Sequence, residues 1–170
     1  MIKARPSQGK NLHEGVYGTP LEFLSAVDAV FPIFFDLAAD SKNQVGNKLD
    51  LDRDGKPMRF FNEETDSLKQ DWASLCKYRL DFLWLNPPFD HIALWAKKCA
   101  EEAAKGARVI LFVPQGTQKW NLDFCQRNSL ELRLDGRMKF DGHDFVYPKD
   151  MSIFIFGIGI VGSAIWSWRD

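Results

Sequence analysis

The chain has 170 residues, a size at which one compact domain buries a core without disulfides or a structural metal. Its three cysteines are widely spaced and include no CxxC pair, which argues against a disulfide framework and a zinc site and favours a reducing, cytoplasmic location. The net charge of -1 and the isoelectric point near 6.3 do not indicate a nucleic-acid-binding protein, because phosphate contacts require clustered Lys and Arg.

The first elements are an arm, a helix and a strand. Residues 1–14 have no apolar segment, so we expect a flexible arm rather than a signal peptide, followed by one domain over residues 15–170. The sequence Thr19-Pro20-Leu21-Glu22 has the pattern of a capping box with Pro at the first helical position, which predicts a helix that begins at Thr19. The apolar run from Phe31 to Leu37 predicts a buried strand.

The middle of the chain alternates loops, strands and helices. The polar segment Asp40 to Pro57 predicts a surface loop, and Leu80 to Leu85 predicts a second buried strand. From Asp90 an apolar stripe with helical spacing runs to Gly106, a residue type that commonly ends a helix. Arg108 to Val113 reads as another strand, and a short helix is expected around Trp120 to Gln126.

The last third of the chain reads as strands. We expect them at Leu130–Leu134, Phe145–Tyr147, Met151–Val161 and Ala164–Trp168, with a hairpin turn at Gly162-Ser163. Its apolar stretch is interrupted by glycines, so a buried hairpin is favoured over a membrane span. Strand, helix, strand in sequence indicates an α/β fold with a mainly parallel sheet, here with an antiparallel C-terminal edge.

Asn86-Pro87-Pro88-Phe89 carries the candidate chemistry, because ligands of open α/β sheets bind at the carboxyl ends of strands. An aromatic amine is a poor nucleophile unless acceptors draw its protons. The side-chain carbonyl of Asn86 and the backbone carbonyl of Pro87 are such acceptors, on a loop stiffened by two prolines. Phe89 offers a face on which a flipped base can stack. A rigid turn followed by a core aromatic is the alternative; the position between strand and helix favours catalysis.

The tetrapeptide resembles the amino-methyltransferase motif (Asn, Asp or Ser, then Pro-Pro, then Tyr, Phe or Trp). Over about residues 17 to 156 the chain resembles the phage-encoded DNA adenine methyltransferase family. The likeness rests on the segments 17–24, 35–40 with Asn43, 70–72, 85–89 and 136–140. It implies a Rossmann-like methyltransferase fold, S-adenosylmethionine as cofactor and duplex DNA as partner, with a use in protecting phage DNA inside the host cytoplasm.

The resemblance also implies which residues bind the cofactor. Three lie near its methionine end: Tyr17, Thr19 and Pro20. The first cofactor loop is Asp36, Leu37, Ala38 and Ala39, where the family's usual glycine-rich loop is not evident. The acidic residue near the adenosine is Asp66 or Asp71, with Asp66 slightly favoured, and a solvated loop carboxylate is the alternative for either.

DNA recognition must come from small elements, because about fifty residues separate Asp36 from Asn86 and show no second core. Between Lys105 and Lys149, eight basic residues stand against five acidic ones. Three of these are candidates for phosphate contacts, although a solvated basic face explains any single one: Lys119, Arg137 and Lys139.

The same tetrapeptide occurs in proteins with other activities, and the sequence does not exclude these alternatives. These are methylation of adenine or guanine in ribosomal RNA, methylation of a glutamine side chain in a protein, and a non-catalytic methyltransferase-like module that binds DNA. No metal site is expected, because the histidines have no Cys or Asp partners at metal-ligand spacing.

Overall fold

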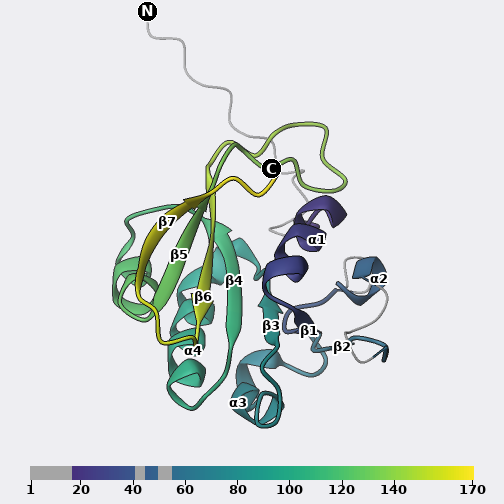
Figure 1. The fold of residues 1–170 in the computed structure, drawn as a ribbon, viewed down its shortest axis with the longest axis vertical. Helices are drawn as coiled ribbons and strands as arrows, with labels where there is room; N and C mark the ends of the chain where they lie inside the picture. The colour runs from purple at the N-terminus through teal and green to yellow at the C-terminus, as the bar shows by residue number, and fades with distance from the viewer. Residues whose placement is uncertain (1–16, 41–44, 50–54) are drawn as a thin grey trace, which may run out of the picture.

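Strands of one sheet form the centre of the fold, with helices on both faces (Figure 1). The computed structural model describes residues 17–40, 45–49 and 55–170. The strands are β1 (Ile33–Asp36), β2 (Arg59–Phe60), β3 (Phe82–Leu85), β4 (Val109–Pro114), β5 (Ser129–Leu134), β6 (Met151–Phe156) and β7 (Gly162–Trp166). The helices are α1 (Leu21–Val30), α2 (Gly46–Leu49), α3 (Trp72–Leu75) and α4 (Ile92–Ala104), with short turns η1 (Ser67–Lys69) and η2 (Phe89–His91) and a π-helix η3 (Asn121–Gln126).

The strand order is β2-β1-β3-β4-β6-β5-β7, and every pairing is parallel except the two that β6 makes. The prediction of a mainly parallel sheet is therefore confirmed. The antiparallel C-terminal edge and its hairpin are wrong, because the antiparallel strand β6 lies inside the sheet between β4 and β5. The edge strand β7 instead pairs in parallel with β5.

The hairpin prediction failed at its turn. Gly162 and Ser163 lie within β7, and the chain leaves β6 earlier, at Gly157, whose φ of 81° few other residues adopt. A Cβ at Gly157 would also overlap the carbonyl oxygen of Ala107. The buried carboxylate of Glu131 on β5 then accepts hydrogen bonds from Ser152 of β6 (2.9 Å) and Ser163 of β7 (3.3 Å), which joins both neighbours to β5.

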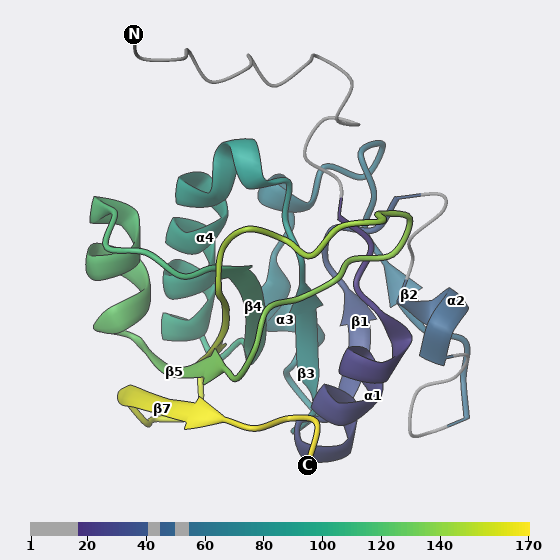
Figure 2. The same cartoon turned by 90° about the horizontal axis from the view of Figure 1, so that it is seen from above.

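Two hydrophobic cores fill the two faces of the sheet because side chains alternate along each strand. Helix α1 lies on one side of the sheet and α4 on the other (Figure 2). On one face α1 packs through Phe23, Leu24 and Val27 against strand residues such as Trp84. On the other face, α3, α4 and η3 pack against the alternate strand residues, among them Leu83. Within the described residues, no helix is long and apolar enough to cross a membrane.

The predicted strands near β1, β3, β4 and β5 and the predicted helices near α4 and η3 are confirmed within a few residues. The capping box is wrong: α1 begins at Leu21, and its N-cap is Pro20, whose side chain has no group that can accept a hydrogen bond from the first turn. The segment Phe145–Tyr147 is not a strand, because Pro148 follows and its residues belong to the β5–β6 connection. The expected loop over residues 40–57 contains α2 and the buried Val45; residues 41–44 and 50–54, like the predicted arm 1–14, lie outside the described residues.

A buried ion network joins α4 to α3. The Glu102 carboxylate, on a side chain only 1% exposed, accepts hydrogen bonds from Lys98 (2.8 Å), Lys105 (2.9 Å) and the backbone N–H of Ala73 (3.0 Å). Burial acts to raise the pKa of Glu102, but these hydrogen bonds lower it to about 2. The ionised form therefore stabilises the fold above the ordinary pKa of 4.5, and this contribution is lost as the pH falls from there through about 2.

We expect Glu102→Gln to lower the free energy of unfolding at pH 7 by about 1–3 kcal/mol, the value of hydrogen bonds to a charged group. The difference from the wild type should shrink toward pH 2. Glu101→Gln is the matched control, because its side chain is 54% exposed and pairs with Lys97 at 3.7 Å, and it should have almost no effect. Urea unfolding from pH 2 to 7 measures this, and equal losses in the two variants would contradict the assignment.

Candidate active site

The order of the strands places the candidate site. The chain passes from β1 outward to β2 and then back to the other side of β1 for β3, so the connections diverge between β1 and β3. Ligands of open α/β sheets bind at the carboxyl ends of strands at such a point. Asp36 ends β1 and Asn86 follows β3, and the two strand ends are joined by a hydrogen bond from Leu37 N–H to the Trp84 carbonyl (2.9 Å).

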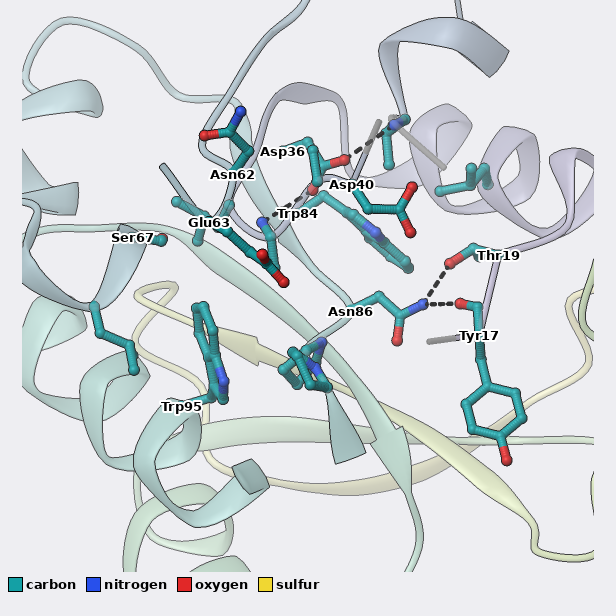
Figure 3. Close-up of a pocket in the computed structure, with 18 of the residues that line it drawn as sticks. Tyr17, Thr19, Asp36, Asp40, Asn62, Glu63, Ser67, Trp84, Asn86 and Trp95 are labelled. Atoms are coloured by element: carbon teal, nitrogen blue, oxygen red, sulfur yellow. Dashed lines mark hydrogen bonds between the residues drawn. The ribbon is translucent and has the colours of Figure 1, made fainter. Parts of the chain in front are cut away.

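A cavity of about 320 Å³ lies at this point (Figure 3). It brings together ten of the residues singled out in the sequence: Tyr17, Thr19, Asp36, Leu37, Ala38, Ala39, Asp66, Asn86, Pro87 and Pro88. Three other residues expected in the cofactor site or the catalytic motif do not line it. Pro20 is the N-cap of α1, and Asp71 caps α3 by accepting a hydrogen bond from Ser74 N–H (3.3 Å). Phe89 faces a different set of residues, described below.

The side chain of Asn86 is held in one orientation. Its Nδ2 donates to the carbonyl oxygen of Tyr17 (2.6 Å) and to Oγ1 of Thr19 (3.0 Å) (Figure 3). Because a backbone carbonyl can only accept, the amide nitrogen has to face Tyr17. Among the described residues no donor contacts Asn86 Oδ1, so this oxygen can accept a hydrogen bond from a ligand. Thr19, expected to cap a helix, instead positions Asn86.

Asp36 organises the loop after β1. Its buried carboxylate accepts hydrogen bonds from the backbone N–H groups of Val45 (3.0 Å) and Ala38 (3.2 Å). Burial raises the pKa of Asp36 to about 6, while the two backbone hydrogen bonds limit the rise. The carboxylate thus joins Ala38 to Val45, which lies in the turn that precedes α2. Asp36, Ala38 and Val45 all line the cavity.

Several residues of the cavity were not predicted from the sequence. The carboxylates of Asp40 and Glu63 line it together with Asp66, and the rings of Trp84 and Trp95 lie on opposite sides of it (Figure 3). Glu63 follows β2 by three residues, and an acidic residue after the second strand of such a sheet is a recurrent ribose ligand. This signal was hidden because β2 has only two residues, too few for a recognisable strand pattern.

The segment around Thr19 is tied to the β5–β6 connection. Lys48 of α2 donates from Nζ to the Thr19 carbonyl and to the Asp141 carboxylate (2.8 Å). Asp141 N–H also bonds to the Gly18 carbonyl (2.9 Å). Two connections far apart in sequence therefore meet beside Asn86, and each supports the other.

Phe89 lies in a cluster of aromatic rings. Tyr17 stacks on it with ring centres 5.1 Å apart and planes at 21°, and His143 stacks on Tyr17 at 5.0 Å. Tyr147 meets Phe89 at 5.8 Å, with its plane inclined by 61°. Tyr17 thus occupies a stacking position on Phe89 that a flipped base was expected to take.

A second cavity, of about 260 Å³, lies next to the tetrapeptide. Phe89 and Asp90 line it together with Pro114 at the end of β4, Trp120 and Tyr147. Because β3 and β4 are parallel neighbours, their carboxyl ends share one edge of the sheet. The two cavities therefore adjoin the same four-residue motif, one through Asn86 to Pro88 and the other through Phe89.

The three predicted phosphate-binding residues lie on the surface and line neither cavity. Lys119 pairs with Asp123 (3.2 Å) and Arg137 with Asp150 (3.6 Å). Lys139 is exposed on the β5–β6 connection. In the described part of the chain, no group of three or more His, Cys, Asp or Glu residues could hold a metal ion.

Comparison with known proteins identifies the family of the chain. The profile of the family described as DNA N-6-adenine-methyltransferase (Dam) matches residues 7–152. A protein of Escherichia phage T1 named DNA N-6-adenine-methyltransferase is 22% identical over 151 residues, which are 85% of this chain and 57% of the phage protein. The chain thus spans less than two thirds of that relative's length. Since the family profile covers most of the chain, including the tetrapeptide, the chain belongs to the DNA N-6-adenine-methyltransferase (Dam) family.

Proposed function

We propose that the protein transfers a methyl group from S-adenosylmethionine to the 6-amino group of adenine in duplex DNA. The observation that carries this proposal is the orientation of Asn86, whose Nδ2 is held by Tyr17 and Thr19 so that Oδ1 remains available as an acceptor beside the cavity. Family membership supports the same activity. We also propose that the sheet is the Rossmann-like methyltransferase fold and that residues 15–170 form one domain.

The first cavity fits the cofactor. Its volume of about 320 Å³ lies within the range of small-molecule sites, about 300–1,000 Å³. When bound, the cofactor supplies a methyl group on a positively charged sulfur, and the carboxylates of Asp36, Asp40, Glu63 and Asp66 give the cavity an excess of negative charge. Apolar walls complete it, with Trp95 as one of them. We assign Glu63 or Asp66 to the ribose hydroxyls, because both line the cavity and Asp71, a helix cap, does not.

We assign activation of the adenine amino group to Asn86 and Pro87. The lone pair of the adenine amino group is delocalised into the ring, which makes this nitrogen a poor nucleophile. Hydrogen bonds from its two N–H groups to Asn86 Oδ1 and the Pro87 carbonyl favour a tetrahedral nitrogen whose lone pair is localised. The stiffness of the Pro-Pro sequence keeps both acceptors in place while charge develops on that nitrogen.

We place the ring of the flipped adenine in the second cavity, with its amino group directed toward Asn86 and Pro87, which line the adjoining first cavity. Phe89, Trp120 and Tyr147 give it aromatic walls, and Asp90 and Gln118 provide polar groups for the base edge. A base there would stack on Phe89 without displacing Tyr17. This placement changes the role first expected for Phe89. One face of its ring contacts Tyr17, and the base would stack on the other face.

The test is to incubate the protein with methyl-labelled S-adenosylmethionine and, separately, duplex DNA, ribosomal RNA and a glutamine-bearing release factor. We expect label in the DNA, recovered as 6-methyladenine after complete digestion. The Asn86→Ala variant controls for a contaminating methyltransferase. Label confined to RNA or protein would assign the same chemistry to another substrate. Cofactor binding without transfer to any of the three would identify a non-catalytic module.

A further inference from the structure

An exposed apolar pair, Phe145 and Val146, lies on the connection between β5 and β6. Phe145 is 46% exposed and Val146 53% exposed, although both are large hydrophobic residues. The connection that carries them is held at several points. Tyr147 N–H bonds to the Met138 carbonyl (2.7 Å), and Asp141 is joined to both Gly18 and Lys48. The pair is therefore presented to solvent by a braced loop.

This loop lies at the same edge of the sheet as the tetrapeptide. β6 is antiparallel to both β4 and β5, so β5 runs in the same direction as β3 and β4. The loop that follows β5 therefore leaves from the edge where Asn86 follows β3, as the green loop at the top of Figure 1 shows.

Aromatic contacts connect the exposed pair to the catalytic tetrapeptide. Phe145 meets the ring of His143 edge-on at 5.3 Å, and His143 stacks on Tyr17, which stacks on Phe89. Two residues beyond Phe145, Tyr147 lines the second cavity. Two residues of chain span at most about 7 Å, so the exposed pair lies within that backbone distance of a residue that lines the cavity assigned to the base.

Charged residues of both signs lie near the pair, and the exposed Asp144 directly precedes Phe145. Lys139 and Lys149 are exposed on the same connection, and Lys149 lines the second cavity. In the described part of the chain no carboxylate pairs with either ammonium group. An exposed apolar pair with two unpaired ammonium groups on the same connection suits a partner in which stacked bases lie between rows of phosphates.

We infer that Phe145 and Val146 insert into the base stack of duplex DNA beside the target adenine and fill the space that the flipped base leaves. This inference rests on the proposed function. Flipping a base costs unstacking and unpairing free energy, and proteins offset that cost by inserting apolar side chains between base steps. The pair would thus promote flipping without taking part in methyl transfer itself.

The test compares matched and weakened base pairs. Adenines methylated by the wild type in a plasmid are first mapped, and one such site is prepared as a matched duplex and as a duplex with an abasic position opposite the adenine. We expect Phe145→Ala with Val146→Ala to slow transfer about tenfold or more on the matched duplex and to come within about threefold of wild type on the abasic one, where flipping costs least. Phe145→Trp with Val146 intact should retain activity on both.

Tyr78→Ala is the matched control, because Tyr78 is an exposed aromatic residue (88%) ahead of β3, at the opposite edge of the sheet. It should leave both rates unchanged. Equal slowing on the two duplexes, or none, would overturn the inference while leaving the proposed function intact. So would a wild-type dimer that the double variant converts to a monomer, since the pair would then join two copies. No methylated adenine in the plasmid would instead contradict the proposed function.

Discussion

Replacing Asn86 with alanine should lower the rate of methyl transfer by about a hundredfold or more, the usual cost of removing one preorganised polar contact at a developing charge. The variant loses Oδ1, the acceptor that we assign to the adenine amino group. Cofactor affinity should change little, because we assign the main cofactor contacts to the loop after β1 and to the acidic residues. Single-turnover kinetics and calorimetric titration with S-adenosylmethionine measure the two effects separately.

Thr19→Val provides the graded control for Asn86. It removes the Oγ1 that accepts from Asn86 Nδ2 at 3.0 Å but leaves the 2.6 Å bond to the Tyr17 carbonyl, so the amide keeps its orientation less firmly. We expect a rate loss of about tenfold or less, the effect of one neutral hydrogen bond of about 1 kcal/mol. A rate for Asn86→Ala within threefold of the wild type would contradict the mechanism, whatever Thr19→Val does.

Replacing Asp36 with alanine should weaken cofactor binding by about tenfold to a hundredfold, because hydrogen bonds to a charged group contribute about 1.5–3 kcal/mol. The carboxylate joins Val45 and Ala38 through their N–H groups, and its loss leaves both groups without a partner and frees the loop that lines the cavity. Thermal unfolding of the same variant shows whether the loss is local. Unchanged affinity would separate Asp36 from the cofactor site.

The protonation of Asp36 adds a pH dependence. Burial raises its pKa from 3.8 to about 6, so the folded protein retains this proton more strongly than the unfolded chain does. Its contribution to stability is therefore fully present below the unfolded value and is lost as the pH rises through about 6. Binding of a positively charged cofactor favours the ionised carboxylate, so affinity should increase over the same pH range. Asp36→Asn should flatten this increase between pH 5 and 8.

Local patterns in the sequence determined much of the fold and of the candidate site. The strands at β1, β3 and β4 are continuous apolar runs, and helix α4 has a clear apolar stripe that ends before Gly106, whose φ is 110°. Such signals depend on a few neighbouring residues, so they can be read without knowing the tertiary structure. For the same reason the tetrapeptide after β3 could be placed at a strand's carboxyl end.

Long-range contacts decided what local patterns could not. Thr19 has the sequence of a helix cap, yet its hydroxyl accepts from Asn86, a residue 67 positions later. The strand β7 pairs with β5 and not with β6, which precedes it in the chain. This pairing is stabilised by the hydrogen bonds from Ser152 and Ser163 to Glu131 and is permitted by the backbone turn at Gly157. Neither the hydrogen bond between Thr19 and Asn86 nor the pairing of β7 with β5 produces a periodic pattern in the sequence.

The sequence by itself determined the mainly parallel α/β sheet and the position of Asn86 to Phe89, because burial along strands and helices imposes regular spacing of apolar residues. Only the tertiary structure decided that Glu63 and Trp95 share a cavity with Asn86, that Tyr17 stacks on Phe89, and that Phe145 stands exposed near both. These features arise where loops from different strands meet at one edge of the sheet. The physical reason is that a loop carries no periodicity, so its contacts are set by the elements that bring its ends together.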